Sequence, residues 1–204
     1  MERRRLDKTE LLARIDADAI LDSDWVKVVK ARFQDRKTDT ITGPARTCME
    51  PHFPRWQSTF WSRVYFRYAL ATFRINVLWG PNMVMRRQVW DRIHDEASTK
   101  DRAVHEDQDL SVLTRLNGFS IINVPELLIS TDGGRFASLG KLLEYNKRRK
   151  ATLLLHRYNL KRIDHDISSL DARLTELVLM PMALIFGISS AICSIEALLG
   201  LRKH

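Results

Sequence analysis

The sequence predicts an α/β fold, because strand-like and helix-like segments alternate along its 204 residues. Short apolar runs bounded by Gly, Pro, Asn or Asp are typical of strands, and apolar residues at helical spacing are typical of helices. Hydrophobic residues make up 45% of the chain and charged residues 28%. These values are ordinary for a folded domain, and the length is sufficient for a real core.

The first half of the chain contains two predicted strands and two predicted helices. Residues 11–15 form an apolar run typical of a buried strand, and the loop DADAILDSD follows it. Apolar residues on one face predict a helix over 24–35, and TITGPA indicates a short strand over 40–45. Aromatic residues at helical spacing predict an amphipathic helix over 55–76.

The second half continues the same alternation. The stretch LWGPNMVMRRQVW, residues 78–90, predicts a turn, a strand and the start of a helix. In VHEDQDLSVLTRLNG, leucines at helical spacing predict a helix that Gly118 ends. Strands are expected at FSIINV and LLIST, on either side of a Pro-Glu pair, and a basic helix over 138–158.

The C-terminal part carries a long uncharged segment. Leu177 to Ile195 reads LVLMPMALIFGISSAICSI and contains no charged residue. A helix of this length spans roughly 28 Å, close to the hydrocarbon core of a bilayer. A buried core helix is the alternative, but the run is apolar all round rather than on one side. We therefore expect a catalytic region over 1–160, and a linker with a membrane-associated helix over 161–204.

The net charge of +8 fits three classes of partner: nucleic acid, an anionic membrane surface or a phosphorylated substrate. No nucleic-acid-binding motif is visible, and the apolar C-terminal segment favours lipid. Binding to nucleic acid is therefore not expected. The two cysteines, Cys48 and Cys193, form no CxxC pattern, so a zinc site is not expected either.

Asp16 and Asp18 follow the first predicted strand, in ARIDADAIL. In an extended segment, residues two apart point to the same face. Like charges so placed repel, and a shared hard cation such as Mg²⁺ or Mn²⁺ would relieve the repulsion. The alternative is a solvated acidic loop, since D-x-D also occurs by chance.

A second acidic cluster, HEDQD, lies at a predicted helix N-terminus. The helix dipole favours negative charge there, so helix capping is one interpretation. The other is that Asp107 or Glu106 faces a cleft as a general base, which must be ionised and within reach of the proton it removes.

The stretch GPNMVMRR is the third candidate for a binding site. Gly80 permits close approach of the backbone, and Asn82 has a side chain that both donates and accepts hydrogen bonds. Arg86 and Arg87 are able to pair with phosphate, or simply lie on the surface.

The order and spacing of these three stretches resemble the later part of a family 2 glycosyltransferase with the GT-A fold. The resemblance covers roughly residues 10–135. It implies a partial GT-A, Rossmann-like mixed sheet flanked by helices. It also implies transfer of a sugar from a nucleotide-sugar donor to an acceptor hydroxyl with inversion.

The resemblance also implies roles for single residues. Asp18 would be the main ligand of Mg²⁺ or Mn²⁺, and Asp16 would contact the nucleotide or share the ion. Asp107 would be the catalytic base, supported by Glu106. The remaining donor- or acceptor-binding candidates are Asn82 on the acceptor side, Gly80, Asp109 and Arg135.

The sequence departs from the family in two places. Only about ten residues precede the D-x-D strand, so the strands that hold the nucleotide are expected to be missing. The Q-x-x-R-W stretch of processive synthases is also absent, and GGRFASLGKLLEYNKRRK occupies that region.

The leading hypothesis is a membrane-located enzyme with a cytoplasmic catalytic region, acting on a lipid or saccharide acceptor for envelope polysaccharide or glycolipid synthesis. The alternatives are a non-enzymatic membrane-interacting remnant, or one part of a split enzyme whose N-terminal half comes from a separate chain.

Overall fold

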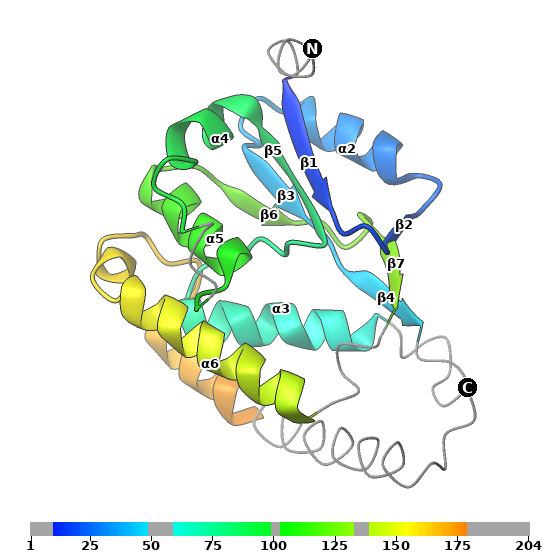
Figure 1. Cartoon of the computed structure of the whole chain (residues 1–204). Coiled ribbons are helices and arrows are strands. Elements are labelled where there is room, and N and C mark those ends of the chain that lie inside the picture. The colour runs from blue at the N-terminus through cyan, green and yellow to red at the C-terminus, as the bar shows by residue number, and fades with distance from the viewer. Residues whose placement is uncertain (1–9, 49–58, 99–102, 133–138, 179–204) are drawn as a thin grey trace, which may run out of the picture.

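A four-stranded mixed sheet is the centre of the molecule, in a computed structural model that describes residues 10–48, 59–98, 103–132 and 139–178 (Figure 1). Its strands are, in spatial order, β1 (Leu11–Ile15), β5 (Asn82–Arg86), β3 (Thr40–Thr42) and β6 (Ile121–Asn123). β5 is antiparallel to both of its neighbours, and β3 and β6 are parallel. The predicted mixed sheet is confirmed.

A smaller sheet lies at the carboxyl end of β3. It contains β2 (Ile20–Leu21), β7 (Ile129–Asp132) and β4 (Ala45–Cys48), with β7 in the middle. The single strand predicted over 40–45 is therefore two strands in two sheets. The break falls at Gly43, where a Cβ atom would lie 2.0 Å from the carbonyl oxygen of Leu127. Only glycine fits so close an approach of two backbones.

Helices cover both faces of the larger sheet. Successive side chains of each strand point to opposite faces, so each face has side chains for a helix to pack against. On one face, α2 (Trp25–Phe33) buries one side of its surface against β3 and β5. On the other face, α4 (Arg87–Ile93) and α5 (Glu106–Leu116) pack against Met83 and Met85.

A further layer of helices packs on the far side of α5. It contains α3 (Phe60–Phe73), α6 (Leu139–Leu155) and the short η3 (Asn159–Lys161) (Figure 1). Val112 of α5 is buried among Phe66 and Phe73 of α3. The helix α5 is thus enclosed between the sheet and this layer, and its first turn lies near the middle of the molecule. The helices predicted over 24–35, 55–76 and 138–158 are confirmed within the described residues, with shorter bounds.

The segment predicted as a polar linker contains a helix over residues 169–178. Ser168 begins it: its Oγ accepts a hydrogen bond from the Asp171 N–H at 3.0 Å and donates one to the Asp171 carboxylate at 2.7 Å. Of the predicted apolar segment, only Leu177 and Val178 belong to the described residues, and the rest lies outside them. Within the described ranges, no helix has both the length and the apolar character needed to cross a membrane.

Candidate active site

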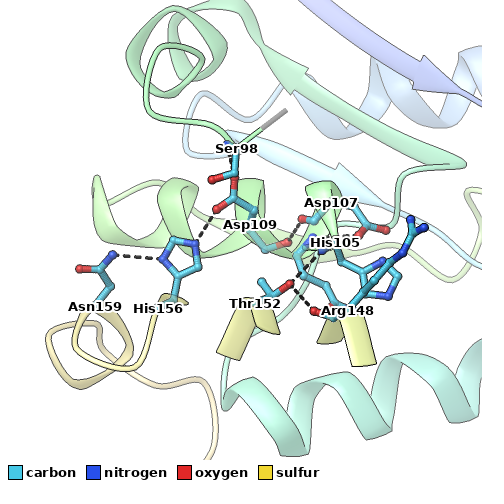
Figure 2. A network of polar contacts seen from close by, with 10 residues as sticks. Ser98, His105, Asp107, Asp109, Arg148, Thr152, His156 and Asn159 are labelled. Atoms are coloured by element: carbon cyan, nitrogen blue, oxygen red, sulfur yellow. Dashed lines mark hydrogen bonds and ion pairs between the residues drawn. The ribbon is translucent and has the colours of Figure 1, made fainter. Parts of the chain in front are cut away.

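Asp107 lies in the first turn of α5 (Figure 2), and two backbone N–H groups fix its side chain. Its Oδ2 accepts a hydrogen bond from Gly80 at 3.1 Å, and its Oδ1 accepts one from Gln108 at 2.9 Å. The side chain is half-buried. The carboxylate therefore has one defined orientation while part of it stays open to a ligand.

The segment before β5 is tied to α5, which brings Gly80 to Asp107. The Leu78 N–H donates to Oγ of Ser111 at 2.8 Å, and that hydroxyl donates to the Asp107 carbonyl at 2.5 Å. A serine inside a helix often bonds back to the carbonyl four residues earlier, and here the same hydroxyl also holds a neighbouring segment. The sequence prediction that Gly80 and Asp107 share a site is consistent with this geometry.

Arg14 is a member of the site that sequence reasoning missed. Its guanidinium forms an ion pair with Glu106 at 3.0 Å, and both side chains are about two-fifths exposed, at 40% and 41%. A Cβ atom on Gly80 would lie 3.5 Å from the Arg14 guanidinium and 3.6 Å from the Asp107 carboxylate. The cation thus lies beside both acidic residues. The signal in the sequence was a lone arginine in the otherwise apolar strand LLARI.

A largely apolar cavity of about 180 Å³ lies next to this ion pair. Residues of the paired strands β1 and β5 line it together with residues of α4 and α5. The lining residues are Leu12, Ala13, Arg14, Met83, Met85, Trp90, Glu106 and Leu110.

Aromatic side chains from three segments surround the other side of Asp107. The ring centroids of Tyr65 and Trp79 are 6.3 Å apart, as are those of Tyr65 and Tyr145. Burial raises the pKa of Tyr145 to about 12, and the negative charge of Asp107 acts in the same direction. Burial likewise raises the pKa of Tyr65. Both phenols are therefore neutral hydrogen-bond donors rather than bases.

His105 precedes α5 and joins it to α6. Its backbone N–H donates to Oγ1 of Thr152 at 2.9 Å, and its ring Nε2 lies 3.0 Å from the carbonyl oxygen of Tyr145. Burial lowers the pKa of this imidazole, and the nearby Asp107 charge opposes the shift without cancelling it. The imidazole is therefore neutral at neutral pH, with its Nε2–H donated to the carbonyl group.

Asp16 and Asp18 lie in a tight turn directly after β1. The strand ends at Ile15, and the Ala19 N–H donates to the Asp16 carbonyl at 3.0 Å. The expectation of an extended segment with both carboxylates on one face is therefore wrong in its geometry, because the backbone turns at the first aspartate. Asp16 is half-buried and Asp18 is exposed.

The Asp16 and Asp18 carboxylates of this turn supply some of the ligands that a hard cation needs. Carboxylate oxygens are the ligands that Mg²⁺ and Mn²⁺ prefer. Within the described ranges, no three His, Cys, Asp or Glu side chains gather closely enough to enclose a metal ion. Two carboxylates on an exposed turn would therefore need phosphate oxygens and water to complete the coordination.

Two predicted site residues are placed in the core instead. Asn82 is fully buried: its Oδ1 accepts from Trp25 Nε1 at 2.9 Å, and its Nδ2 donates to the Leu127 carbonyl at 2.6 Å. Asp109 is 1% exposed and accepts from the Ser98 N–H at 2.7 Å. Neither side chain is free for a substrate, because the amide or carboxylate is used inside the protein.

The predicted arginines also have other partners. The Arg86 guanidinium donates to backbone carbonyls, including that of Thr38 at 2.8 Å, and lies over the ring of Phe33. Arg87 forms an ion pair with Asp91 at 3.5 Å, one turn along α4. Arg86 is thus a structural residue rather than a phosphate ligand. Arg135 lies outside the described residues.

Comparisons with known proteins support the resemblance. A family model, Glycosyltransferase like family 2, matches residues 2–152. No curated protein matches the chain. Among solved structures, the chain is similar to the mannosyltransferase PcManGT from Pyrobaculum calidifontis, determined in complex with GDP-Man and Mn²⁺.

The similarity to the mannosyltransferase has a TM-score of 0.51 at 16% sequence identity, and it covers 98% of this chain and 59% of that one. It supports a GT-A-like α/β fold, and the chain spans less than two-thirds of the length of that protein. Because the family model matches most of the sequence, from residue 2 to residue 152, the chain belongs to the Glycosyltransferase like family 2.

Proposed function

We propose that this protein transfers a sugar from a nucleotide-sugar donor to a hydroxyl group of a lipid or saccharide acceptor. The observation that carries the proposal is the Asp107 carboxylate, held by the Gly80 and Gln108 N–H groups at the start of α5. A general base must be positioned before it is useful, and this carboxylate is positioned on a rigid helix.

The proposed reaction is a single displacement. Asp107 accepts the proton of the acceptor hydroxyl while the hydroxyl oxygen attacks the anomeric carbon of the donor sugar. The bond from that carbon to the diphosphate oxygen breaks, and the nucleoside diphosphate leaves with the bonding electron pair. Attack from the side opposite the leaving group inverts the anomeric carbon. Arg14 compensates the charge of Glu106 next to the base.

Asp18 and Asp16 are the proposed holders of Mg²⁺ or Mn²⁺, together with the donor diphosphate. The ion would supply positive charge that stabilises the leaving diphosphate. The mannosyltransferase with the similar fold was determined with GDP-Man and Mn²⁺, which supports a divalent ion and a nucleotide sugar here.

The test is transfer of labelled sugar from a panel of GDP- and UDP-sugars, with membrane lipids and oligosaccharides as acceptors. We expect product only with Mn²⁺ or Mg²⁺, and no product after chelation or in Asp18→Asn. Asp18 is exposed, so the variant should fold as the wild type does. Metal-independent transfer, or full activity in Asp18→Asn, would contradict the proposed metal site.

We also propose a location at a membrane, with the catalytic region in the cytoplasm. One face of α6 presents exposed leucines and lysines at helical spacing, Leu143, Lys147, Lys150 and Leu154. The helix over 169–178 has exposed leucines on one face as well, Leu170, Leu174 and Leu177. Basic amphipathic faces of this kind bind anionic lipid surfaces.

A second candidate function is one part of an enzyme assembled from two chains, and the edge of β1 favours it. Among the described strands, β1 pairs only with β5. The Arg87 N–H donates to the Glu10 carbonyl, and this register turns the N–H and C=O groups of Leu11, Ala13 and Ile15 away from β5. An open edge of this kind accepts a strand from another polypeptide.

Ala13→Pro tests this candidate, because proline removes the outward N–H and leaves the bonds to β5. Activity that requires a second chain, and is lost in Ala13→Pro but kept in Ala13→Val, would support assembly from two chains. Transfer by the purified chain alone would exclude that requirement. If the chain binds lipid but no nucleotide, both alone and together with a second chain, the non-enzymatic alternative would be supported.

A further inference from the structure

A buried polar pair outside the candidate active site joins α5 to the end of α6 (Figure 2). Nε2 of His156 lies 2.5 Å from Oδ1 of Asp109, and the residues are 4% and 1% exposed. Removing an imidazole and a carboxylate from water is unfavourable unless their polar atoms find partners. Apolar side chains of similar volume would satisfy packing alone, so the pair indicates a requirement beyond packing.

The hydrogen bonds of the pair are complete, and they select one tautomer of the imidazole. The second oxygen of Asp109 accepts from the Ser98 N–H at 2.7 Å, and Nδ2 of Asn159 donates to Nδ1 of His156 at 3.1 Å. Since Nδ1 accepts a hydrogen bond, the ring proton is on Nε2 and is donated to Asp109. The direction of donation therefore runs from Asn159 through His156 to Asp109.

The pair lies in the same helical turn as Asp107. Residues two apart on an α-helix differ in direction by about 200°, so Asp107 and Asp109 point to opposite sides of α5. Asp109 is directed to the end of α6, and Asp107 is directed to Gly80. The contact between Asp109 and His156 therefore fixes the rotation of this turn about the helix axis, which decides where the Asp107 carboxylate points.

The remaining contacts from α6 act at a different point. Thr152 and the carbonyl group of Tyr145 both bind His105, just before α5 begins. These contacts fix where the helix starts. The His156 contact supplies a second point of attachment to α6, on the side of α5 away from Gly80, and it adds to the bond between Ser111 and Leu78 in resisting rotation about the axis.

We propose that His156 is a positioning residue, which orients Asp107 through Asp109 by fixing the first turn of α5. The proposal rests on the proposed role of Asp107 as the base. Its geometric part concerns the hydrogen bond between Gly80 and Asp107, which is measurable without any enzymatic activity.

The first experiment measures hydrogen exchange of the Gly80 amide by NMR in the full chain, in the wild type, His156→Leu and His156→Gln. Leucine removes the donor to Asp109, while glutamine places an amide N–H near the position of Nε2. We expect Gly80 exchange to rise about tenfold in His156→Leu and to return towards the wild-type rate in His156→Gln. Amides of the central strand β5 should be unchanged. Unchanged Gly80 exchange in His156→Leu would overturn the proposal.

The control is Val112→Ala, which creates a cavity in the same helix on the side facing α3. It should lower stability without changing the exchange of Gly80. Equal effects of Val112→Ala and His156→Leu on Gly80 would mean that general loosening of α5 is responsible, and would overturn the proposal. If His156→Leu does not fold, His156→Asn replaces it, because its shorter amide does not reach Asp109.

The second experiment measures sugar transfer. We expect kcat to fall about 10- to 100-fold in His156→Leu with KM for the donor little changed, because the base is misplaced rather than the donor site damaged. His156→Gln should recover most of kcat. A rise in KM with kcat unchanged would overturn the positioning role. If the wild type has no transferase activity while Gly80 exchange responds as expected, the proposed function fails and the positioning by His156 stands.

Discussion

At the scale of single residues, the surroundings of the polar side chains decide their roles. Asp107 and Glu106 were predicted from the sequence, and the structure adds Arg14 of β1, whose guanidinium pairs with Glu106. Opposite charges thus meet where β1 approaches the start of α5. Their balance leads to a prediction for Arg14.

Arg14→Met keeps the unbranched apolar stem of the side chain and removes its charged guanidinium. We expect transfer to fall about tenfold, corresponding to about 1.4 kcal/mol, because Glu106 is left as an uncompensated negative charge beside the base. Stability should change by less than about 1 kcal/mol, since the pair is partly exposed. The control is Arg32→Met, which removes an equally simple ion pair, the exposed one between Arg32 and Glu126. Equal kinetics of the two variants would show that Arg14 has no role in the site.

Asn82→Ala tests the assignment of Asn82 to the core. The variant leaves Trp25 Nε1 and the Leu127 carbonyl without their partner. Each buried polar group left without a partner lowers the stability by about 1–3 kcal/mol. Urea unfolding should therefore show a free energy of unfolding lower by at least about 2 kcal/mol. The activity of each folded molecule should be unchanged. A stable variant with a raised KM for acceptor would instead support the substrate-binding role expected from the sequence.

At the scale of elements, His105 joins α5 to α6 and makes the stability of the protein depend on pH. Burial lowers the pKa of this imidazole from 6.5 in the folded protein. As the pH falls below 6.5, the unfolded chain therefore gains a proton that the folded chain resists, and stability falls. His105→Asn removes this titration and places a residue that caps helices well at the N-cap position of α5. Urea unfolding above and below that pH should show a smaller acid loss in the variant, and equal losses would contradict the account.

The exposed face of α6 leads to a prediction about lipids. Replacing Lys147 and Lys150 by Glu should weaken binding to vesicles that contain anionic phospholipid, because each lysine near such a surface contributes about 1 kcal/mol. Binding to neutral vesicles should be weak and unchanged. The matched control replaces Lys27 and Lys30, which are on α2. If both double variants lose binding equally, net charge rather than the α6 face is responsible.

At the scale of the whole molecule, apolar patterns predicted the architecture well. Strands 11–15 and 82–86, and helices α2, α5 and α6, follow from apolar spacing and helix-ending residues. Gly43 shows where this reasoning stops, because its requirement comes from Leu127, distant in sequence. The same holds for the site: Asp107 follows from its motif, while the structural roles of Asn82, Arg86 and Asp109 depend on partners that only tertiary packing supplies.

The central claim is that Asp107 is the base of a sugar transferase. The most direct measurement compares transfer to acceptor and binding of the nucleoside diphosphate in wild type, Asp107→Asn and the surface control Asp91→Asn, each with Mn²⁺. Asp107→Asn should lower transfer by about 10²- to 10⁴-fold and leave nucleotide binding and stability near wild type. Asp91→Asn should behave as wild type. Transfer that survives in Asp107→Asn would contradict the account and leave this carboxylate as a helix cap.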